Sequence, residues 1–131
     1  MDEWNSLKIK RVYSSAEEAD GYRILIDRLW PRGISKAKAM IDEWNKTIAP
    51  STELRKWFAH KEENYAVFAN EYRKELDASS NAALFAKHVG KILTQSPVTL
   101  LYGAKSESCN HAIILRDWIL NFSHSTKQPE R

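Results

Sequence analysis

The amino-acid sequence predicts an α/β fold: a three-layer single domain with a small, mainly parallel sheet and about four to five helices. Strand-like apolar segments stand near both ends of the chain, and about seventy residues with helical patterns separate the last of them from the one before it. Such a crossover favours parallel pairing, because antiparallel neighbours are usually joined by short hairpins. A length of 131 residues fits one domain over 1–131. The polar ends, 1–6 and 123–131, are expected to fray.

Three segments have the sequence pattern of strands. Residues 7–12 alternate apolar and basic side chains, which is typical of a half-exposed strand. Residues 22–30 are rich in branched side chains and end at Pro31, which biases the preceding residue toward extended geometry. Residues 98–102 are continuously apolar and predict a buried central strand. The intervening segment 13–21 is short for a parallel crossover, so the place of the first strand in the sheet stays open.

Four segments repeat apolar side chains at three- and four-residue spacing and predict amphipathic helices. Ser51 and Asn81 are the expected N-caps of the first and third helices, and Asn110 precedes the fourth. Residues 41–48 fit either a short helix or an edge strand. The four helical segments are 51–58, 65–76, 84–93 and 114–122.

Composition limits the class of protein. The formal net charge of +3 permits binding of nucleic acid or phosphorylated metabolites without demanding it. No stretch approaches the ~18 consecutive apolar residues of a membrane span, and the acidic first residues lack the apolar core of a secretory signal. Cys109 is the single cysteine, which excludes an internal disulfide framework. We therefore expect a cytoplasmic protein without a membrane partner, and the oligomeric state stays open.

Sequence motifs for common cofactors are missing. The chain contains neither the glycine-rich P-loop of nucleotide hydrolases nor the Gly-x-Gly-x-x-Gly turn of dinucleotide-binding proteins. The four histidines and the cysteine do not have the spacing of zinc ligands. We accordingly expect no cofactor and no metal.

A cationic turn follows the second predicted strand and is the most informative feature of the sequence. Arg28, Arg32 and Lys36 occur in it without an acidic residue among them. Arginine presents a planar fork that can grip phosphate or carboxylate through two hydrogen bonds. An ion pair between Arg28 and a nearby acid such as Asp27 is the structural alternative.

A second loop, 103–111, is expected to meet this turn. Ligands of open parallel sheets bind beyond the carboxyl ends of the strands, and this loop opens the last helix, whose unpaired N–H groups favour an anion. For Arg55 and Lys56, on the first long helix, a role at the site and a purely solvated position both stay open. The predicted ligand-binding residues are Arg28, Arg32, Lys36, Lys105 and Asn110.

Asp27 and His111 are the candidate proton-transfer residues, because both would stand at this edge of the sheet; Tyr102 is a lesser candidate. His111 could equally cap or pack at the helix start, and Asn110 is most simply an N-cap. Cys109 could act as a nucleophile if it were exposed and acidified by the helix N-terminus.

Several unbroken segments carry a family resemblance. The longest run contains Asp-Arg-Leu-Trp-Pro-Arg-Gly-Ile-Ser-Lys at 27–36. The chain resembles the bacterial YeaO-like proteins of the domain-of-unknown-function 488 (DUF488) family, which implies a small cytosolic α/β domain and brings no assigned reaction. The segments that carry the resemblance are 9–13, 20–36, 48–58 and 98–105, together with 110–112.

The resemblance also bears on catalysis. Wider relatives carry Cys-His-Arg where this chain has Asn110, His111 and Ala112. The cysteine and arginine of that triplet are missing here, and Cys109 stands one place early. The comparison of motifs therefore argues against cysteine chemistry in this chain.

Together these features predict binding of an anionic ligand, a nucleotide or a nucleic-acid phosphate, at the carboxyl edge of the sheet. Two alternatives stay open. One is a non-enzymatic protein-interaction module that uses the five Trp and five Tyr side chains. The other is an enzyme that acts on a nucleotide or nucleic acid by hydrolysis, transfer or glycosidic cleavage.

Overall fold

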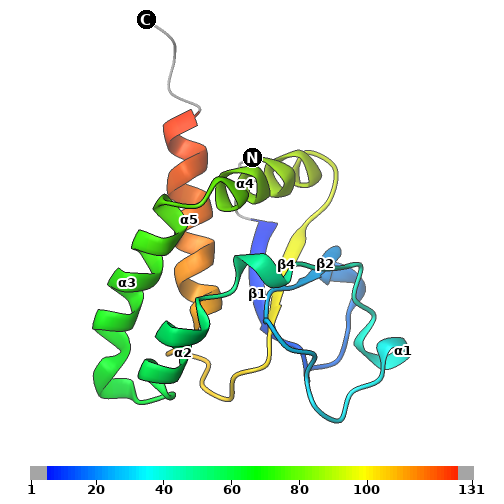
Figure 1. The fold of residues 1–131 in the computed structure, drawn as a ribbon. Helices are drawn as coiled ribbons and strands as arrows, with labels where there is room; N and C mark the ends of the chain where they lie inside the picture. The colour runs from blue at the N-terminus through cyan, green and yellow to red at the C-terminus, as the bar shows by residue number, and fades with distance from the viewer. Residues whose placement is uncertain (1–5, 127–131) are drawn as a thin grey trace, which may run out of the picture.

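The computed structural model describes residues 6–126 and contains one parallel sheet (Figure 1). The strands lie in the order β1-β4-β2-β3, and each pairs in parallel with its neighbours. The predicted α/β domain with a mainly parallel sheet is confirmed. The strands are β1 (Leu7–Arg11), β2 (Tyr22–Leu25), β3 (Glu43–Trp44) and β4 (Val98–Tyr102).

The position of β4 explains how a short link can join β1 to β2. The two strands are not neighbours, because β4 pairs with both of them. The link between them includes a single 3-10 turn, η2 (Glu18–Asp20). It ends at Gly21, whose φ of 67° suits glycine and whose Cα approaches the Pro97 carbonyl too closely for a side chain. The predicted strand 7–12 thus belongs to the sheet, as an edge strand.

Two predicted segments differ from the structure. The strand predicted over 22–30 ends at Leu25, although the amide of Ile26 still donates to Leu101. From Asp27 onward the chain leaves the sheet and bends toward the segment after β4. The ambiguous segment 41–48 contains the two-residue strand β3, followed by a 3-10 turn.

Four longer helices cover one face of the sheet (Figure 1). Ser51 caps the first by accepting from the Leu54 amide, as predicted. The third is capped by Ser79, which accepts from Ala82, so the prediction of Asn81 was wrong by two residues. These helices are α2 (Thr52–Phe58), α3 (Tyr65–Asp77), α4 (Ser80–Leu93) and α5 (His111–Thr126).

The main hydrophobic core lies between the sheet and these helices. Ile24 of β2 and Leu100 of β4 are fully buried in it and share it with Tyr72 of α3 and Leu115 of α5. Every second strand residue faces this core, as the period of a β-strand requires. The four longer helices therefore cover the face of the sheet on which this core lies.

The other face of the sheet is covered by loops, η2 and the short helix α1 (Lys36–Ala39). Leu25 and Leu101 pack there with Trp30 and Trp44, whose rings meet edge to face at 5.3 Å. This third layer is thinner than the helical one, because it contains no long helix in the part of the chain that the structure describes.

A buried ionic cluster completes this second face. Asp20 binds Arg23 and Lys10, and both Asp20 and Arg23 are 4% exposed. Arg23 also donates to the main-chain carbonyls of Ala39 and Met40. The cluster thereby joins η2, β1, β2 and the end of α1.

Of the ends predicted to fray, 1–5 and 127–131 lie outside the described residues, whereas 123–126 continue α5. Among the helices described, none combines the length and the apolar character needed to cross a bilayer.

Candidate functional site

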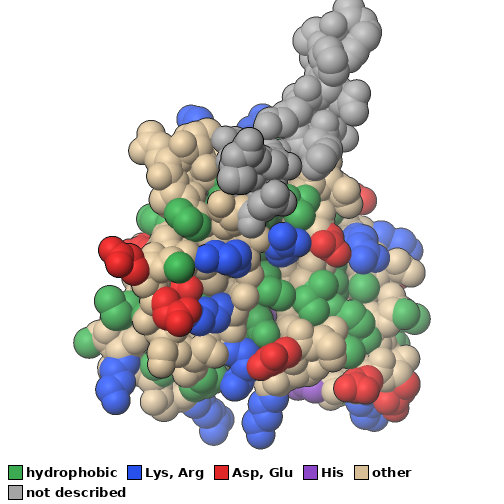
Figure 2. Space-filling view, turned by 180° about the vertical axis from the view of Figure 1, so that it is seen from behind, with side chains coloured by type: hydrophobic (Ala, Val, Ile, Leu, Met, Phe, Trp, Pro, Cys, Tyr) green, Lys and Arg blue, Asp and Glu red, His purple; other side chains and the backbone are tan. Residues whose placement is uncertain are grey.

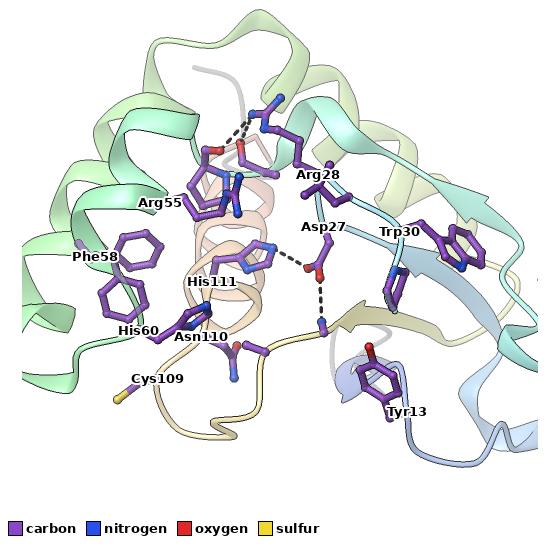
Figure 3. Close-up of a pocket in the computed structure, with 17 residues that line it drawn as sticks. Tyr13, Asp27, Arg28, Trp30, Arg55, Phe58, His60, Cys109, Asn110 and His111 are labelled. Carbon is purple, nitrogen blue, oxygen red and sulfur yellow. Dashed lines mark hydrogen bonds and ion pairs between the residues drawn. The ribbon is translucent and has the colours of Figure 1, made fainter. Parts of the chain in front are cut away.

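A pocket of about 240 Å³ lies where β2 and β4 end (Figure 3). The strands point their carboxyl ends at it, which is where ligands of open parallel sheets bind. The helix α2 and the residue after its cap supply Arg55, Phe58 and His60 to its wall. The other lining segments are Tyr13, 27–31, 49–50, Phe68, 103–104 and 109–111.

Asp27 stands at the centre of the pocket. Its Oδ2 accepts a hydrogen bond of 2.9 Å from the amide of Gly103, and its Oδ1 lies 3.4 Å from Nε2 of His111. A Cβ at Gly103 would come within 2.8 Å of Oδ2. The glycine that ends β4 is therefore what lets the carboxylate approach the main chain so closely.

His111 is the first residue of α5, and its ring is almost completely buried. Nε2 faces two acceptors, the Ile26 carbonyl at 3.1 Å and the Asp27 carboxylate. A neutral ring therefore carries its proton on Nε2 and its lone pair on Nδ1. Burial lowers the pKa of His111, and the charge of Asp27 opposes this effect without reversing it.

Burial acts on Asp27 in the opposite direction. It raises the pKa of the carboxyl above its ordinary value, while the charge of His111 and the Gly103 amide hold it down. Arg55 and His60, which line the same pocket, also lower the pKa of Asp27 electrostatically. A carboxyl and an imidazole with opposed shifts in one pocket are typical of functional sites.

Arg28 lies in the wall of the pocket and forms no ion pair with any residue that the structure describes. Its Nη2 donates to the carbonyls of Ala49 and Pro50, at 3.3 and 3.0 Å. Its Nε is buried and has no hydrogen-bond partner within residues 6–126, and the same holds for Oδ1 of Asp27. The alternative of a structural ion pair between Arg28 and Asp27 is therefore not realised.

His60 enters the pocket through an unusual backbone conformation. Ala59 and His60 are consecutive left-handed residues, with φ of 49° and 58°. Such residues are strained by roughly 1–2 kcal/mol each and cluster at functional sites. They turn the chain after α2 so that the His60 ring packs 5.9 Å from Phe58. Nothing in the residue pattern predicted this, because periodicity carries no signal for a left-handed pair.

Asn110 caps α5, and Cys109 points away from Asp27 and His111 (Figure 3). Asn110 is 2% exposed, and its side chain donates to Ser106 and accepts from the amide of Ile113 in the first turn of α5. Its amide is thus occupied as a helix cap. Cys109 is partly exposed, and Figure 3 shows its sulfur directed away from Asp27 and His111.

The predicted site residues are divided between the pocket and its surroundings. Asp27, Arg28, Asn110 and His111 come together as lining residues, as the meeting of the two loops predicted. The remaining three predicted cations are exposed outside the lining, because the chain turns outward after Pro31 and Ala104. They are Arg32, Lys36 and Lys105.

No group of three His, Cys, Asp or Glu side chains with the geometry of a metal site occurs in the described part of the chain. Tyr102, the lesser catalytic candidate, is buried in the helical core, and burial raises the pKa of its hydroxyl. These observations leave Asp27, His111 and the neighbouring cations as the groups available to a ligand.

The chain belongs to the DUF488 family. Residues 6–131 match the family model described as the inactive DUF488-N3 subclade. The uncharacterized protein YeaO of Escherichia coli K12 is 48% identical over 87% of this chain and 96% of its own length. The uncharacterized proteins Mb3100c of Mycobacterium bovis and Rv3073c of Mycobacterium tuberculosis H37Rv are each 37% identical, over 83% of this chain and 89% of theirs. No solved structure matches the chain.

Proposed function

We propose that this protein binds a small phosphate-bearing ligand of the nucleoside monophosphate type in the pocket at the carboxyl ends of β2 and β4, without catalysing a reaction on it. One observation carries the proposal: Arg28 Nε and Asp27 Oδ1 are buried without hydrogen-bond partners among residues 6–126, with only the longer 3.4 Å contact from Oδ1 to Nε2 of His111, and both residues line the same pocket. A buried unpaired polar atom costs about 1–3 kcal/mol. A ligand that offers an anionic oxygen to the arginine and an N–H or O–H to the carboxylate removes both costs.

The charges around the pocket support an anionic ligand. Arg28 and Arg55 are permanent cations, whereas Asp27 is the one acid among the lining residues. His60 adds positive charge when it is protonated. A phosphate monoester carries more negative charge than a carboxylate and accepts the bidentate fork of arginine.

The size and walls of the pocket support a ligand with one ring system. A volume of about 240 Å³ is below the ~300–1,000 Å³ that is common for drug-sized ligands. Apolar wall is supplied by Phe58, Phe68, Trp30 and Pro31. An aromatic base fits such walls, and its N–H groups are donors that suit Oδ1 of Asp27.

The start of α5 supports a binding role rather than a catalytic one. Asn110 stands where wider relatives carry cysteine, and both ends of its amide are occupied in capping the helix. The matching subclade is described as inactive. In this proposal the Asp27–His111 pair holds the ligand and does not transfer a proton to it.

A thermal-shift titration tests the proposal with nucleoside monophosphates, nucleosides and inorganic phosphate as separate probes. At a hundredfold excess over Kd, a monophosphate should stabilise the protein by about 2.7 kcal/mol and raise Tm by several degrees. Arg55→Gln should remove the shift. Lys56→Gln, the matched control on the same helix but outside the pocket lining, should keep it.

The proposal fails if none of the monophosphates raises Tm, or if Lys56→Gln removes the shift as fully as Arg55→Gln. A shift produced equally by inorganic phosphate and by monophosphates would contradict the role given to the apolar walls.

A further inference from the structure

A small cluster of side chains stands beside the pocket mouth and is not used by the proposed ligand. Tyr13 lines the mouth and is 43% exposed. The guanidinium of Arg11 lies 5.0 Å from the centre of its ring, and the Tyr13 hydroxyl donates to the main-chain carbonyl of Arg32 at 2.9 Å. Arg11 also donates to Ala104, which lines the pocket as well. These contacts hold the Arg11 guanidinium over an exposed aromatic ring and the main chain of Arg32 beside its hydroxyl.

Lys105 follows Ala104 and extends the same group, which we call the Tyr13 ledge (Arg11, Tyr13, Arg32 and Lys105). None of its three cations forms an ion pair among the described residues. Glu107 is the acid of this loop, so cations outnumber acids on the ledge. The cations lie outside the pocket lining, and a mononucleotide in the pocket leaves them without a role.

We infer that the occupant of the pocket is one nucleotide of a single-stranded nucleic acid, whose neighbouring phosphates and base are held by the Tyr13 ledge. The inference rests on the proposed function. Proteins that bind single strands combine cations that follow the backbone with aromatic rings on which bases stack. The ledge offers both beside a pocket with room for one ring system, and a strand supplies the next base and phosphates at a fixed distance from the first.

The surface view shows no large, uniformly basic area on the face that it presents. Figure 2 shows Lys and Arg side chains interrupted by Asp and Glu across the face seen from behind. Basic side chains project at its lower margin, which is the end of the molecule where α2 and the segment after β4 lie in Figure 1. Separate cations of this kind suit a few successive phosphates better than a wrapped duplex.

The test compares fluorescein-labelled 12-nucleotide single strands of DNA and RNA, and the duplex of the same DNA, by fluorescence anisotropy in a salt series. The single strands should bind at least tenfold more tightly than nucleoside monophosphates and than the duplex. The double variant Arg32→Gln/Lys105→Gln should weaken strand binding at least tenfold. It should also reduce the slope of log K against log salt by about 1.4, at ~0.7 for each lost phosphate contact.

Three controls separate the contributions. Lys87→Gln/Lys91→Gln, which removes the same charge from the exposed side of α4, should leave binding and slope unchanged. Tyr13→Leu should weaken strand binding without changing the slope, whereas Tyr13→Phe should retain most of the affinity. The mononucleotide thermal shift should survive Arg32→Gln/Lys105→Gln and Lys87→Gln/Lys91→Gln, whose residues lie outside the pocket lining, and the melting curve of each variant reports whether it is folded.

The outcomes distinguish the two proposals. If monophosphates bind but strands bind no more tightly, the inference is overturned and the proposed function stands. If neither monophosphates nor strands bind, the proposed function fails and the inference with it. If strands bind but Arg55→Gln leaves their affinity unchanged, the strand does not enter the pocket and the inference is again overturned.

Discussion

The carboxylate of Asp27 ties the end of β2 to the end of β4, because its Oδ2 accepts the amide of Gly103 at 2.9 Å. The other oxygen of the same side chain is buried and lies 3.4 Å from Nε2 of His111. One carboxylate thus holds two loops together and stands beside the imidazole of the candidate site. A substitution at this residue changes both the link between the loops and the candidate site.

Asp27→Ala should lower the free energy of unfolding by about 1–3 kcal/mol, because it leaves the Gly103 amide without its acceptor. Asp27→Asn should cost less, since its amide oxygen can still accept from Gly103 and the burial of a charge is relieved. Urea unfolding of the three proteins measures the order. Equal stability of wild type and Asp27→Ala would contradict the role of this hydrogen bond.

The buried His111 should make stability depend on pH. Its lowered pKa means that the folded state favours the neutral ring, so stability is full above 6.5, the ordinary pKa, and is lost as pH falls toward the folded pKa. The raised pKa of Asp27 acts in the opposite sense, in a window that begins at 3.8. The loss from His111 cannot exceed about 1.4 kcal/mol per pH unit.

His111→Gln should therefore flatten the pH dependence of unfolding between pH 7.5 and pH 5.5 (roughly one pH unit either side of the ordinary histidine pKa), while its amide can still donate to Ile26. Urea unfolding at several pH values tests this, and parallel profiles for wild type and His111→Gln would refute it.

Two glycines with positive φ should differ sharply in their tolerance of alanine. Gly21 and Gly33 have φ of 67° and 75°, but an added Cβ would collide with the Pro97 carbonyl at Gly21 and meet nothing within 4 Å at Gly33. Gly33→Ala should cost about 1–2 kcal/mol from backbone strain. Gly21→Ala should cost clearly more, because the link from η2 into β2 must move. Thermal unfolding of both variants compares them, and equal Tm values would exclude the steric effect.

The buried Asp20 should matter far more to stability than an exposed acid. Asp20→Ala leaves Arg23 buried and unpaired, which is expected to cost about 3–5 kcal/mol. Glu71→Ala breaks an exposed ion pair with Lys74 and should cost less than ~1 kcal/mol. Urea unfolding measures both, and a small effect at Asp20 would indicate that water replaces its carboxylate.

Much of the fold follows from periodicity and crossover length. The apolar run 98–102 and the long helical segment before it predicted a central parallel strand, and β4 is that strand. The end of β2 was predicted too late, because Asp27 leaves the sheet to bind Gly103, a contact between residues far apart in sequence. The cap at Ser79 was missed for a simpler reason: Asn81 and Ser79 are both good caps, and sequence alone does not rank them.

The sequence predicted the part of the pocket that depends only on the meeting of the two loops at the edge of the sheet. Asp27, Arg28 and His111 meet because parallel strands end at one edge. His60 was missed, since it enters through a left-handed turn that has no sequence pattern. Arg32 and Lys105 lie outside the lining because side-chain direction in a loop depends on local hydrogen bonds, such as the one from Tyr13 to the Arg32 carbonyl.

The strand order has a consequence for synthesis of the protein. β1 pairs with β4 alone, and β2 has the two-residue β3 as its other neighbour. Residues 12–97 separate β1 from β4. A ribosome needs roughly 4–17 s to add these residues at ~5–20 residues per second. Throughout that interval the first strand has no mate, so the nascent chain depends on its basic residues at alternate positions to resist pairing with other chains.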